Sequence, residues 1–530
     1  KTFLKTFLSI CLFMSTLSSP TGIKAVINQE LVMEAARSFS PVILREINNL
    51  HIPNQKFSVN AGVGKAHFEV QNISIHLDSL PMQNLNVAFS PPNNVDVSFE
   101  GANAGGDFTI KIKFLFYKDH YPISIFLKNM KIAAKLNLSS QPSTKNPGSL
   151  VPMISVSDID LNFDFDFKIR TKVIGKLVDI IKGALRGTIK DLIRHEMVGQ
   201  LKGNLTRVIN QMIQKVDFEP KLENSLSLDI SLMEAPHMSQ NKIILNVKGI
   251  VFDKDIPETK TPPFTPSEIN EEGLLEKQMD VLVSEYVCKS ALYTLSKSTV
   301  VDFTIYRNDV PKEVSRFADL TTDSLNTLLP GIKSKYGSGK DVKLKVHLAE
   351  TDPKAEGVQF IDGEIQFLEG AVVSFIPEGQ EQEESAIDLE IRINGDVSLK
   401  VAENADIDIA VNKAKITEIK VVNSNINQLS RFSIGAIRRL LNFITSTVGI
   451  PMLNREVLSK LKFKIPVFMG ITFKDSQVRV GVDKVEVGVT PDFTQFTPTL
   501  AAFYEEILLQ SINVESLLME YGFEREQDQE

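Results

Sequence analysis

Three side chains that carry oxygen ligands stand two residues apart in the stretch DIDLNFDFDFKIR. Asp158, Asp160 and Asn162 have the spacing of the first ligands in a calcium-binding EF-hand loop. Such a loop also requires glycine at its sixth position and glutamate at its twelfth, where this sequence has Phe163 and Ile169. We therefore expect no metal site in this stretch.

Other motifs that could carry chemistry are also incomplete. The stretches NAGVGKAH (60–67) and YGSGKDV (336–342) lack the first glycine of a phosphate-binding loop and a Ser or Thr after the lysine. HEMVG (195–199) lacks the second histidine of a His-Glu-x-x-His zinc motif, and no Gly-x-Ser-x-Gly occurs. The sequence therefore predicts neither an enzyme nor a cofactor.

The stretch that begins at Asp158 alternates between polar and apolar residues as far as Arg170. Its apolar residues are Ile159, Leu161, Phe163, Phe165, Phe167 and Ile169. A period of two predicts a β-strand with one apolar and one solvated face. Thirteen residues at about 3.3 Å each span roughly 40 Å, whereas a usual strand has about five or six residues.

The first 18 residues have the composition of a secretory signal peptide. Two lysines precede an apolar run (7–14) that is too short to span a bilayer, and small residues follow it. No other segment approaches 18 uninterrupted apolar residues. We therefore expect a soluble chain that is secreted or resides in the lumen of the secretory-endosomal pathway.

Cysteines and glycosylation motifs fit this route. Of the two cysteines, Cys11 lies in the predicted signal peptide, so we expect no disulfide. The apolar surroundings of Cys288 predict an inert buried thiol. Asn-x-Ser/Thr motifs predict N-glycosylation at Asn72, Asn137 and Asn204.

The chain divides into two halves with elements in the same order. In the first half, a predicted helix over 29–49 precedes long alternating segments, and the strand at 158–170 leads into a helical pattern over 171–216 that could exceed 40 residues. In the second half, a predicted helix over 272–295 precedes further strands and a second long helix over 427–461. This order indicates a duplication of helix, sheet and long helix.

A long strand with a phenylalanine-rich face is typical of a strongly bent sheet, and a long apolar-striped helix can lie against its concave side. A sheet curled around such a helix forms a tube lined with hydrocarbon. If side chains leave space, the elongated apolar cavity suits an acyl chain; if they fill it, the tube is only a core. The residues that we expect to line the cavity are Leu31, Ala35, Phe39, Val42, Phe163, Phe165, Phe167, Ile174, Leu177, Ile181 and Leu185.

Five segments are similar to those of one known protein family. They are TGIKAVINQELVMEAA (21–36), GKAHFEVQNISI (64–75), KNMKIAAKLNLSSQPSTKNPG (128–148), TPPFTPSE (261–268) and MDVLVSEYVCKSALYTL (279–295). The first three resemble the first domain of the bactericidal/permeability-increasing, lipopolysaccharide-binding and lipid transfer proteins, the fourth resembles their linker, and the fifth resembles the start of their second domain. The resemblance implies an α+β fold of two pseudo-symmetric tubular barrels, joined by a central sheet into a boomerang, each with an apolar phospholipid pocket.

This resemblance also divides the chain. We expect a signal peptide (1–18), an N-terminal lipid-binding barrel (19–220), a central sheet with a proline-rich linker (221–271), a C-terminal lipid-binding barrel (272–490) and an acidic tail with an amphipathic helix (491–530). The partner would be a phospholipid or a related lipid, bound by a monomer for sequestration or transfer. The net charge of −8 argues against nucleic acid.

Two other functions stay open. One is recognition of bacterial envelope lipid (lipopolysaccharide) in host defence, although the loops that match the lysine-rich tip of the antibacterial members offer only Lys65. The other is a structural or protein-interaction role with filled barrels.

Two surface features have alternative interpretations. Lys182, Arg186, Lys190 and Arg194 stand four residues apart on the first long helix, as either a solvated face or a contact with anionic lipid headgroups at a membrane. The tail (499–523) has apolar residues at helical spacing. It would be either a docked terminal helix or a lid over a pocket mouth, resembling the tail helix of cholesteryl ester transfer protein.

Overall fold

The computed structural model of the chain describes residues 20–60, 64–114, 117–169, 175–223, 225–239, 241–298, 301–312, 319–349, 357–379, 384–401, 406–426, 433–459, 463–464 and 471–506. The predicted signal peptide (1–18) and the tail beyond residue 506 lie outside these ranges.

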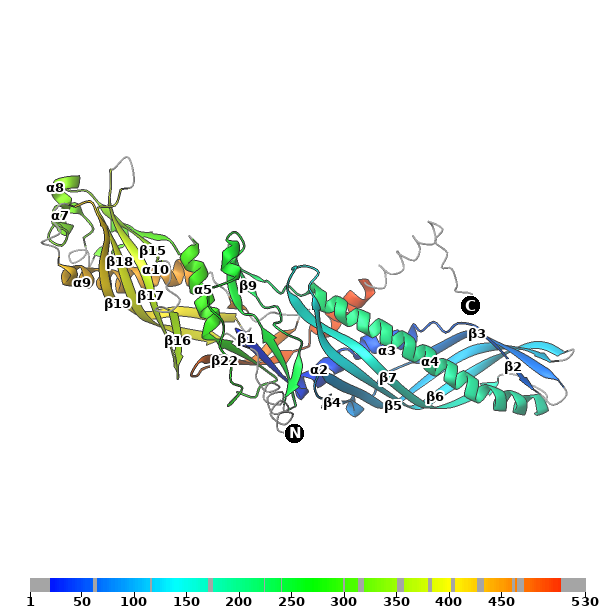
Figure 1. The fold of residues 1–530 in the computed structure, drawn as a ribbon. Helices are drawn as coiled ribbons and strands as arrows, with labels where there is room; N and C mark the ends of the chain where they lie inside the picture. Colours follow the sequence, from blue (N-terminus) through cyan, green and yellow to red (C-terminus); the bar gives the residue numbers. More distant parts are fainter. Residues whose placement is uncertain are drawn as a thin grey trace, which may run out of the picture.

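Long strands and one very long helix give the molecule an extended shape (Figure 1). A six-stranded sheet from the first half lies at one end, and a seven-stranded sheet from the second half lies at the other. A second six-stranded sheet lies between them, next to a three-stranded sheet.

The first sheet has the strand order β2-β3-β5-β6-β7, with β4 paired to β5. Its strands are β2 (Gln55–Asn60), β3 (Lys65–Leu77), β4 (Asn86–Ser90), β5 (Asn94–Phe114), β6 (Tyr117–Pro142) and β7 (Leu150–Ile169). β7 has 20 residues and keeps the predicted apolar face buried as far as Phe167, which confirms the long alternating strand. Register shifts near Gly101 and Asn129, both with positive φ, let the long strands bend.

The helices of the first half are α2 (Gln29–Ser38), α3 (Ser40–Asn48) and α4 (Gly175–Lys215). The prediction of one helix over 29–49 is wrong at Phe39, where α2 ends and α3 begins. Pro41 in the first turn of α3 has no backbone N–H to continue the hydrogen bonds of α2. α4 runs for 41 residues, which confirms the predicted long helix.

The central sheet joins the two halves. Its strands, in spatial order, are β10 (His237–Ser239), β11 (Lys242–Val247), β1 (Ile23–Asn28), β13 (Met279–Ser284), β22 (Lys484–Asp492) and β21 (Thr472–Val480). β1 and β13 are antiparallel neighbours, with Ile23 opposite Val283. Each leads directly into a helix, β1 into α2 and β13 into α5 (Glu285–Lys297), so each half opens with a strand and a helix.

The predicted helix over 272–295 is therefore wrong in its first part. MDVLVS (279–284) is strand β13, in which alternate residues are buried, and the helix begins at Glu285. Val and Leu occur in both strands and helices, so a short apolar window does not separate the two. The antiparallel pairing of this segment with β1 and β22 stabilises it as a strand.

The second sheet has the order β14-β15-β17-β18-β19-β20, with β16 paired to β17. Its strands are β14 (Phe303–Ile305), β15 (Val342–Leu348), β16 (Gly357–Ile361), β17 (Glu364–Pro377), β18 (Ile387–Val401), β19 (Asp406–Ser424) and β20 (Phe463–Lys464). The three-stranded sheet consists of β8 (Lys221–Glu223), β9 (Leu226–Asp229) and β12 (Ile250–Asp253). Short helical turns are η1 (Met82–Asn84), η2 (Pro257–Lys260), η3 (Arg307–Asp309), α7 (Thr322–Leu325) and α8 (Ile332–Tyr336).

The second long helix, predicted over 427–461, is not one α-helix. Within the described residues 433–459, α9 (Ile434–Ile444) and α10 (Ile450–Leu453) alternate with the π-helical segments η5 (Thr445–Gly449) and η6 (Asn454–Leu458). Pro451 lacks a backbone N–H, so the α-helical hydrogen-bond ladder is interrupted there.

Candidate functional site

The apolar face of β7 and the apolar stripe of α4 share one interior. Phe163, Phe165 and Phe167 are 2%, 6% and 7% exposed, and Ile189 and Ile193 of α4 are 0% exposed. With side chains of β3, β5 and β6 they form a single apolar cluster. The predicted apolar face is confirmed, while its role as the lining of a cavity stays a prediction.

α4 lies along the edge of β7 away from β6, where the described residues place no neighbouring strand beyond a single bridge from Leu150 to Leu232 (Figure 1). The Asn210 side chain takes the place of a neighbouring strand. Its Oδ1 accepts from the N–H of Ile154 at 3.0 Å, and its Nδ2 donates to the Ile154 carbonyl at 2.6 Å. Thr206 accepts from the N–H of Val156 at 3.0 Å, and Lys202 donates to the next carbonyl along the strand at 2.7 Å. These bonds satisfy edge groups that would otherwise need water or a partner chain.

We call a side-chain amide that bonds both the N–H and the C=O of one residue an amide clamp. Two more amide clamps act in the first half. Asn48 of α3 bonds Leu77 at the end of β3, with distances of 2.7 and 3.1 Å. Gln200 of α4 bonds His51 at 3.2 and 2.6 Å. Side-chain amides thus fix α3 and α4 to the rest of the first half.

The predicted lining residues do not form one group. Phe39 and Val42 pack against a helix over residues 496–506. Leu31 is buried and Ala35 is half-buried on α2, outside the cluster that holds the three phenylalanines. Ile174 lies outside the described residues, as do the side chains of Leu177, Ile181 and Leu185.

The helix over 496–506 follows the central sheet in the chain, yet it docks on the first half. Its residues Phe496, Leu500 and Tyr504 are each 1% exposed in a cluster with Val42 and Val208. The described part of the tail is therefore docked, as both the docked-helix and the lid interpretation require. The lid stays a prediction.

Polar bonds complete the docking. The Tyr504 hydroxyl donates to the buried carboxylate of Glu46 at 2.5 Å, and Asn204 Nδ2 donates to the other oxygen of that carboxylate at 2.7 Å. Burial, and then this hydrogen bond, raise the pKa of Tyr504. Arg45 and Glu505 form an exposed ion pair beside it at 2.9 Å.

The basic stripe of α4 faces the acidic side of β7. Arg186 and Arg194 lie 3.9 and 3.1 Å from aspartate oxygens of β7. The ammonium group of Lys190 lies 5.4 Å from the ring centre of Phe163, and the Lys182 side chain lies outside the described residues. β7 therefore partly neutralises the described part of the stripe. Contact with lipid headgroups stays a prediction.

Exposed basic side chains gather at the far end of the first sheet, on its outer face. Lys113 of β5 stands opposite Lys118 of β6 and His67 of β3, and Lys111 stands opposite His120. We call these five residues the distal basic cluster. The cluster was not predictable from the loop lysines alone, because strand register decides which residues of different strands become neighbours.

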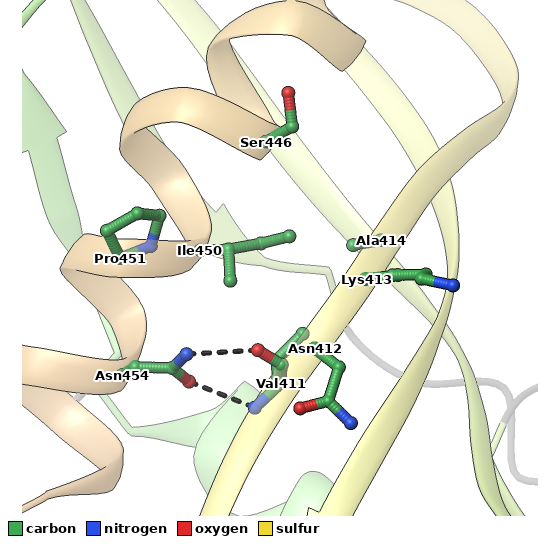
Figure 2. Close-up of a pocket in the computed structure, with 8 residues that line it drawn as sticks. All are labelled: Val411, Asn412, Lys413, Ala414, Ser446, Ile450, Pro451 and Asn454. Atoms are coloured by element: carbon green, nitrogen blue, oxygen red, sulfur yellow. Dashed lines mark hydrogen bonds between the residues drawn. The ribbon is translucent and has the colours of Figure 1, made fainter.

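A pocket of about 560 Å³ lies in the second half between β19 and the helical segment (Figure 2). Its lining residues are Val411, Asn412, Lys413, Ala414, Ser446, Ile450, Pro451 and Asn454. Asn454 is an amide clamp on Val411, with both hydrogen bonds at 3.0 Å (Figure 2). Asn442 accepts from the N–H of Ile416 at 2.7 Å. The pocket therefore lies between two points at which the helical segment is bonded to the strand edge.

The three predicted glycosylation sites differ in their surroundings. Asn72 is exposed at a register shift of β3, with φ of 52°. The side-chain nitrogen of Asn137 donates to Asn94 at 3.3 Å, and that of Asn204 donates to the buried Glu46. Glycans at all three sites stay predictions, and the surroundings favour Asn72.

The part of the chain that the structure describes contains no group of three or more His, Cys, Asp or Glu residues that could hold a metal ion. None of its helices is long and apolar enough to cross a membrane. Cys288 is half-buried beside an apolar cluster, and burial raises the pKa of its thiol to about 12, so the inert thiol stays a prediction that this environment supports.

Comparison with known proteins gives a consistent family assignment. The sequence model described as "LBP / BPI / CETP family, C-terminal domain" matches residues 220–490, just over half of the chain. Lipopolysaccharide-binding protein of Mus musculus is 20% identical over 475 residues, which cover 86% of this chain and 91% of that protein. Phospholipid transfer protein of Homo sapiens is 20% identical over 454 residues, or 84% of each chain.

A solved structure supports the fold. The crystal structure of lipopolysaccharide binding protein superimposes with a TM-score of 0.54 at 17% identity, over 89% of this chain and 99% of that chain. The likeness shows a mixed, strand-rich fold with curled sheets.

Proposed function

This chain belongs to the LBP / BPI / CETP family, and we propose on that premise that it binds phospholipid-like amphiphiles, to sequester or transfer them. The observation that carries the proposal is the continuous apolar layer between β7 and α4. Each CH₂ group that moves from water into such a layer contributes about 0.8 kcal/mol. A long acyl chain could therefore supply most of the binding free energy while the headgroup stays in solvent.

In this proposal the two halves are tubular barrels joined by the central sheet in a boomerang, and each can hold lipid. The first interior would take an acyl chain along Phe163, Phe165 and Phe167, and the pocket beside β19 would belong to the second. The protein would act as a secreted or luminal monomer without a cofactor.

Lipid analysis of the intact protein tests this proposal. We expect native mass spectrometry of the full chain from a secretory host to show bound phospholipid, which organic extraction releases. Ile193→Trp adds bulk to the interior of the first half and should lower phospholipid uptake. His195→Trp, two positions along on the exposed side of α4, is the matched control. Lipid-free protein that also takes up no phospholipid from vesicles would favour the structural role with filled barrels.

The alternative is recognition of bacterial envelope lipid such as lipopolysaccharide, and the distal basic cluster favours it. Lys113 and Lys118 on adjacent strands would attract the phosphate groups of such a lipid, whereas Glu69 lies 4.0 Å from Lys111 and partly neutralises it. Lys113→Glu with Lys118→Glu should weaken lipopolysaccharide binding at low salt and leave uptake of neutral phospholipid unchanged. Unchanged lipopolysaccharide binding in that variant would exclude the cluster.

The helix over 496–506 covers Phe39 and Val42, two of the predicted lining residues, and we propose that it acts as a lid. β22 continues to Asp492, so a truncation should follow that residue to preserve the central sheet. The shortened chain should take up phospholipid faster. A stable truncation with the same uptake rate as the full chain would refute the lid.

A further inference from the structure

In both halves, side chains of a helix form hydrogen bonds with the edge of a β-strand, but these bonds are closer together in the first half than in the second. In the first half, Lys202, Thr206 and Asn210 follow one another at each turn of α4, and all three bond the backbone of β7. In the second half, the bonds of Asn442 and Asn454 to β19 are separated by twelve residues (442 to 454). The pocket occupies this interval.

The helical segment opposite the pocket is also irregular. The π-helical segment η5 (Thr445–Gly449) leads into the short α10, which contains Pro451. The hydroxyls of Ser446 and Thr447 donate to the carbonyl of Phe443 at 2.9 and 2.8 Å. π-Helical turns are rare in proteins, and those that occur often lie at functional sites. The segment therefore lacks a continuous α-helical ladder where it passes the pocket.

The pocket lining suits an amphiphile. Ile450 points toward the strand in Figure 2, next to Val411, while Asn412 and Lys413 lie on the strand itself. Ile444 and Val448, which lie on the same helical segment, are 2% and 6% exposed in the apolar cluster of the second half. Apolar side chains of this segment thus lead from the pocket toward that interior.

We propose that this gap is the port through which the acyl chain of a phospholipid passes between solvent and the interior of the second half. The Asn454 clamp sets how readily the port opens. The inference rests on the proposed lipid-binding function and adds the route by which lipid reaches the interior of the second half. The headgroup remains beside Asn412, Lys413 and Ser446 while the acyl chain passes Ile450.

The number of hydrogen bonds that must break favours an opening between the helical segment and β19. We call this helix–strand contact the seam. The wall between β18 and β19 is a ladder with register from Ile387 to Val401, so opening it would break many backbone bonds together. Opening the seam breaks the two bonds of Asn454. One net hydrogen bond changes an equilibrium about fivefold and two change it about thirtyfold. A backbone group released at the pocket can bond to water instead.

The test measures the initial rate at which the full chain takes up pyrene-labelled phosphatidylcholine from phosphatidylcholine vesicles. Asn454→Leu removes both bonds and should raise the rate about fivefold to thirtyfold, if port opening limits uptake. Asn454→Asp keeps the acceptor for Val411 N–H and should give an intermediate rate. Ile450→Trp fills the pocket and should lower the rate at least fivefold.

Asn210→Leu is the matched control, because Thr206 and Lys202 still hold the first seam, and its rate should stay within about twofold of wild type. Near-ultraviolet circular dichroism identifies any variant that has lost its fold. Unchanged rates in folded Asn454→Leu, Asn454→Asp and Ile450→Trp, with normal wild-type uptake, would overturn the port alone. Absence of uptake by the wild type would overturn the lipid-binding function together with the port.

Discussion

Asp280 tests how the central sheet holds the two halves together. It lies on β13 and is 2% exposed, and Glu486 on the neighbouring strand β22 is 1% exposed. Burial raises the pKa of Asp280 from 3.8 to about 6, against the opposing effect of the Lys277 backbone N–H, which donates to its carboxylate at 3.3 Å. The nearby charge of Glu486 raises the pKa further, and Lys242 lowers it.

The sign of the pH effect follows from this shift. Between about pH 4 and pH 6 the folded protein holds a proton on Asp280 that the unfolded chain has released. This contribution to stability is intact below pH 3.8 and is lost as the pH rises through about 6. Relative to low pH, proton linkage at Asp280 therefore lowers the free energy of unfolding by about 1 kcal/mol at pH 4.5 and by about 3 kcal/mol at pH 7.5.

Asp280→Asn keeps an acceptor for the Lys277 N–H and cannot ionise. Relative to wild type, its free energy of unfolding should therefore gain about 2 kcal/mol more at pH 7.5 than at pH 4.5. Urea unfolding at both pH values measures this difference. Asp483→Asn makes the same charge change at an exposed turn and should show no such difference. Parallel pH profiles for wild type and Asp280→Asn would refute the reasoning.

Three further predictions concern the first half. Tyr504→Phe leaves the buried Glu46 carboxylate without one hydrogen-bond donor. Limited proteolysis within 496–506 should therefore become about fivefold to tenfold faster. An unchanged rate would show that apolar packing alone holds the helix. Glycopeptide mass spectrometry of secreted protein should find the highest glycan occupancy at Asn72, because the side-chain nitrogens of Asn137 and Asn204 are hydrogen-bonded; equal occupancy at all three motifs would contradict this reasoning. Thr206→Val should lower the free energy of unfolding by about 1 kcal/mol, measured in urea, because the Val156 N–H loses its acceptor; unchanged stability would mean that water replaces the hydroxyl.

Periodicity predicted the elements that have one buried and one solvated face. β7 and α4 both meet this condition over many residues, so alternation and the 3.6-residue stripe identify them. Periodicity failed where an apolar segment is short. MDVLVS (279–284) forms β13 because it pairs with β1 and β22, which lie far from it in the sequence.

The candidate site was predictable only in its apolar part. A sequence does not show that Glu46 will meet Tyr504, because the two residues are 458 positions apart. The distal basic cluster depends on register in the same way, since Lys113 and Lys118 become neighbours only through the pairing of β5 with β6. The amide clamps left a weaker signal: Asn210 is a polar residue of a helix in which Val208 and Met212, two positions before and after it, are buried.

Closing a sheet edge with a helix has a physical consequence that closing it with a strand would not have. An added strand would extend the backbone ladder, and its separation would break many bonds cooperatively. A helix places apolar side chains on the interior and holds the edge through a few side-chain bonds, as α4 does on β7. Each such bond depends on one side chain, so a single substitution can loosen the seam without changing the pairing of the sheet. The spacing of these side-chain hydrogen bonds along the helix, close in the first half and wide in the second, can therefore differ between halves that share the same order of elements.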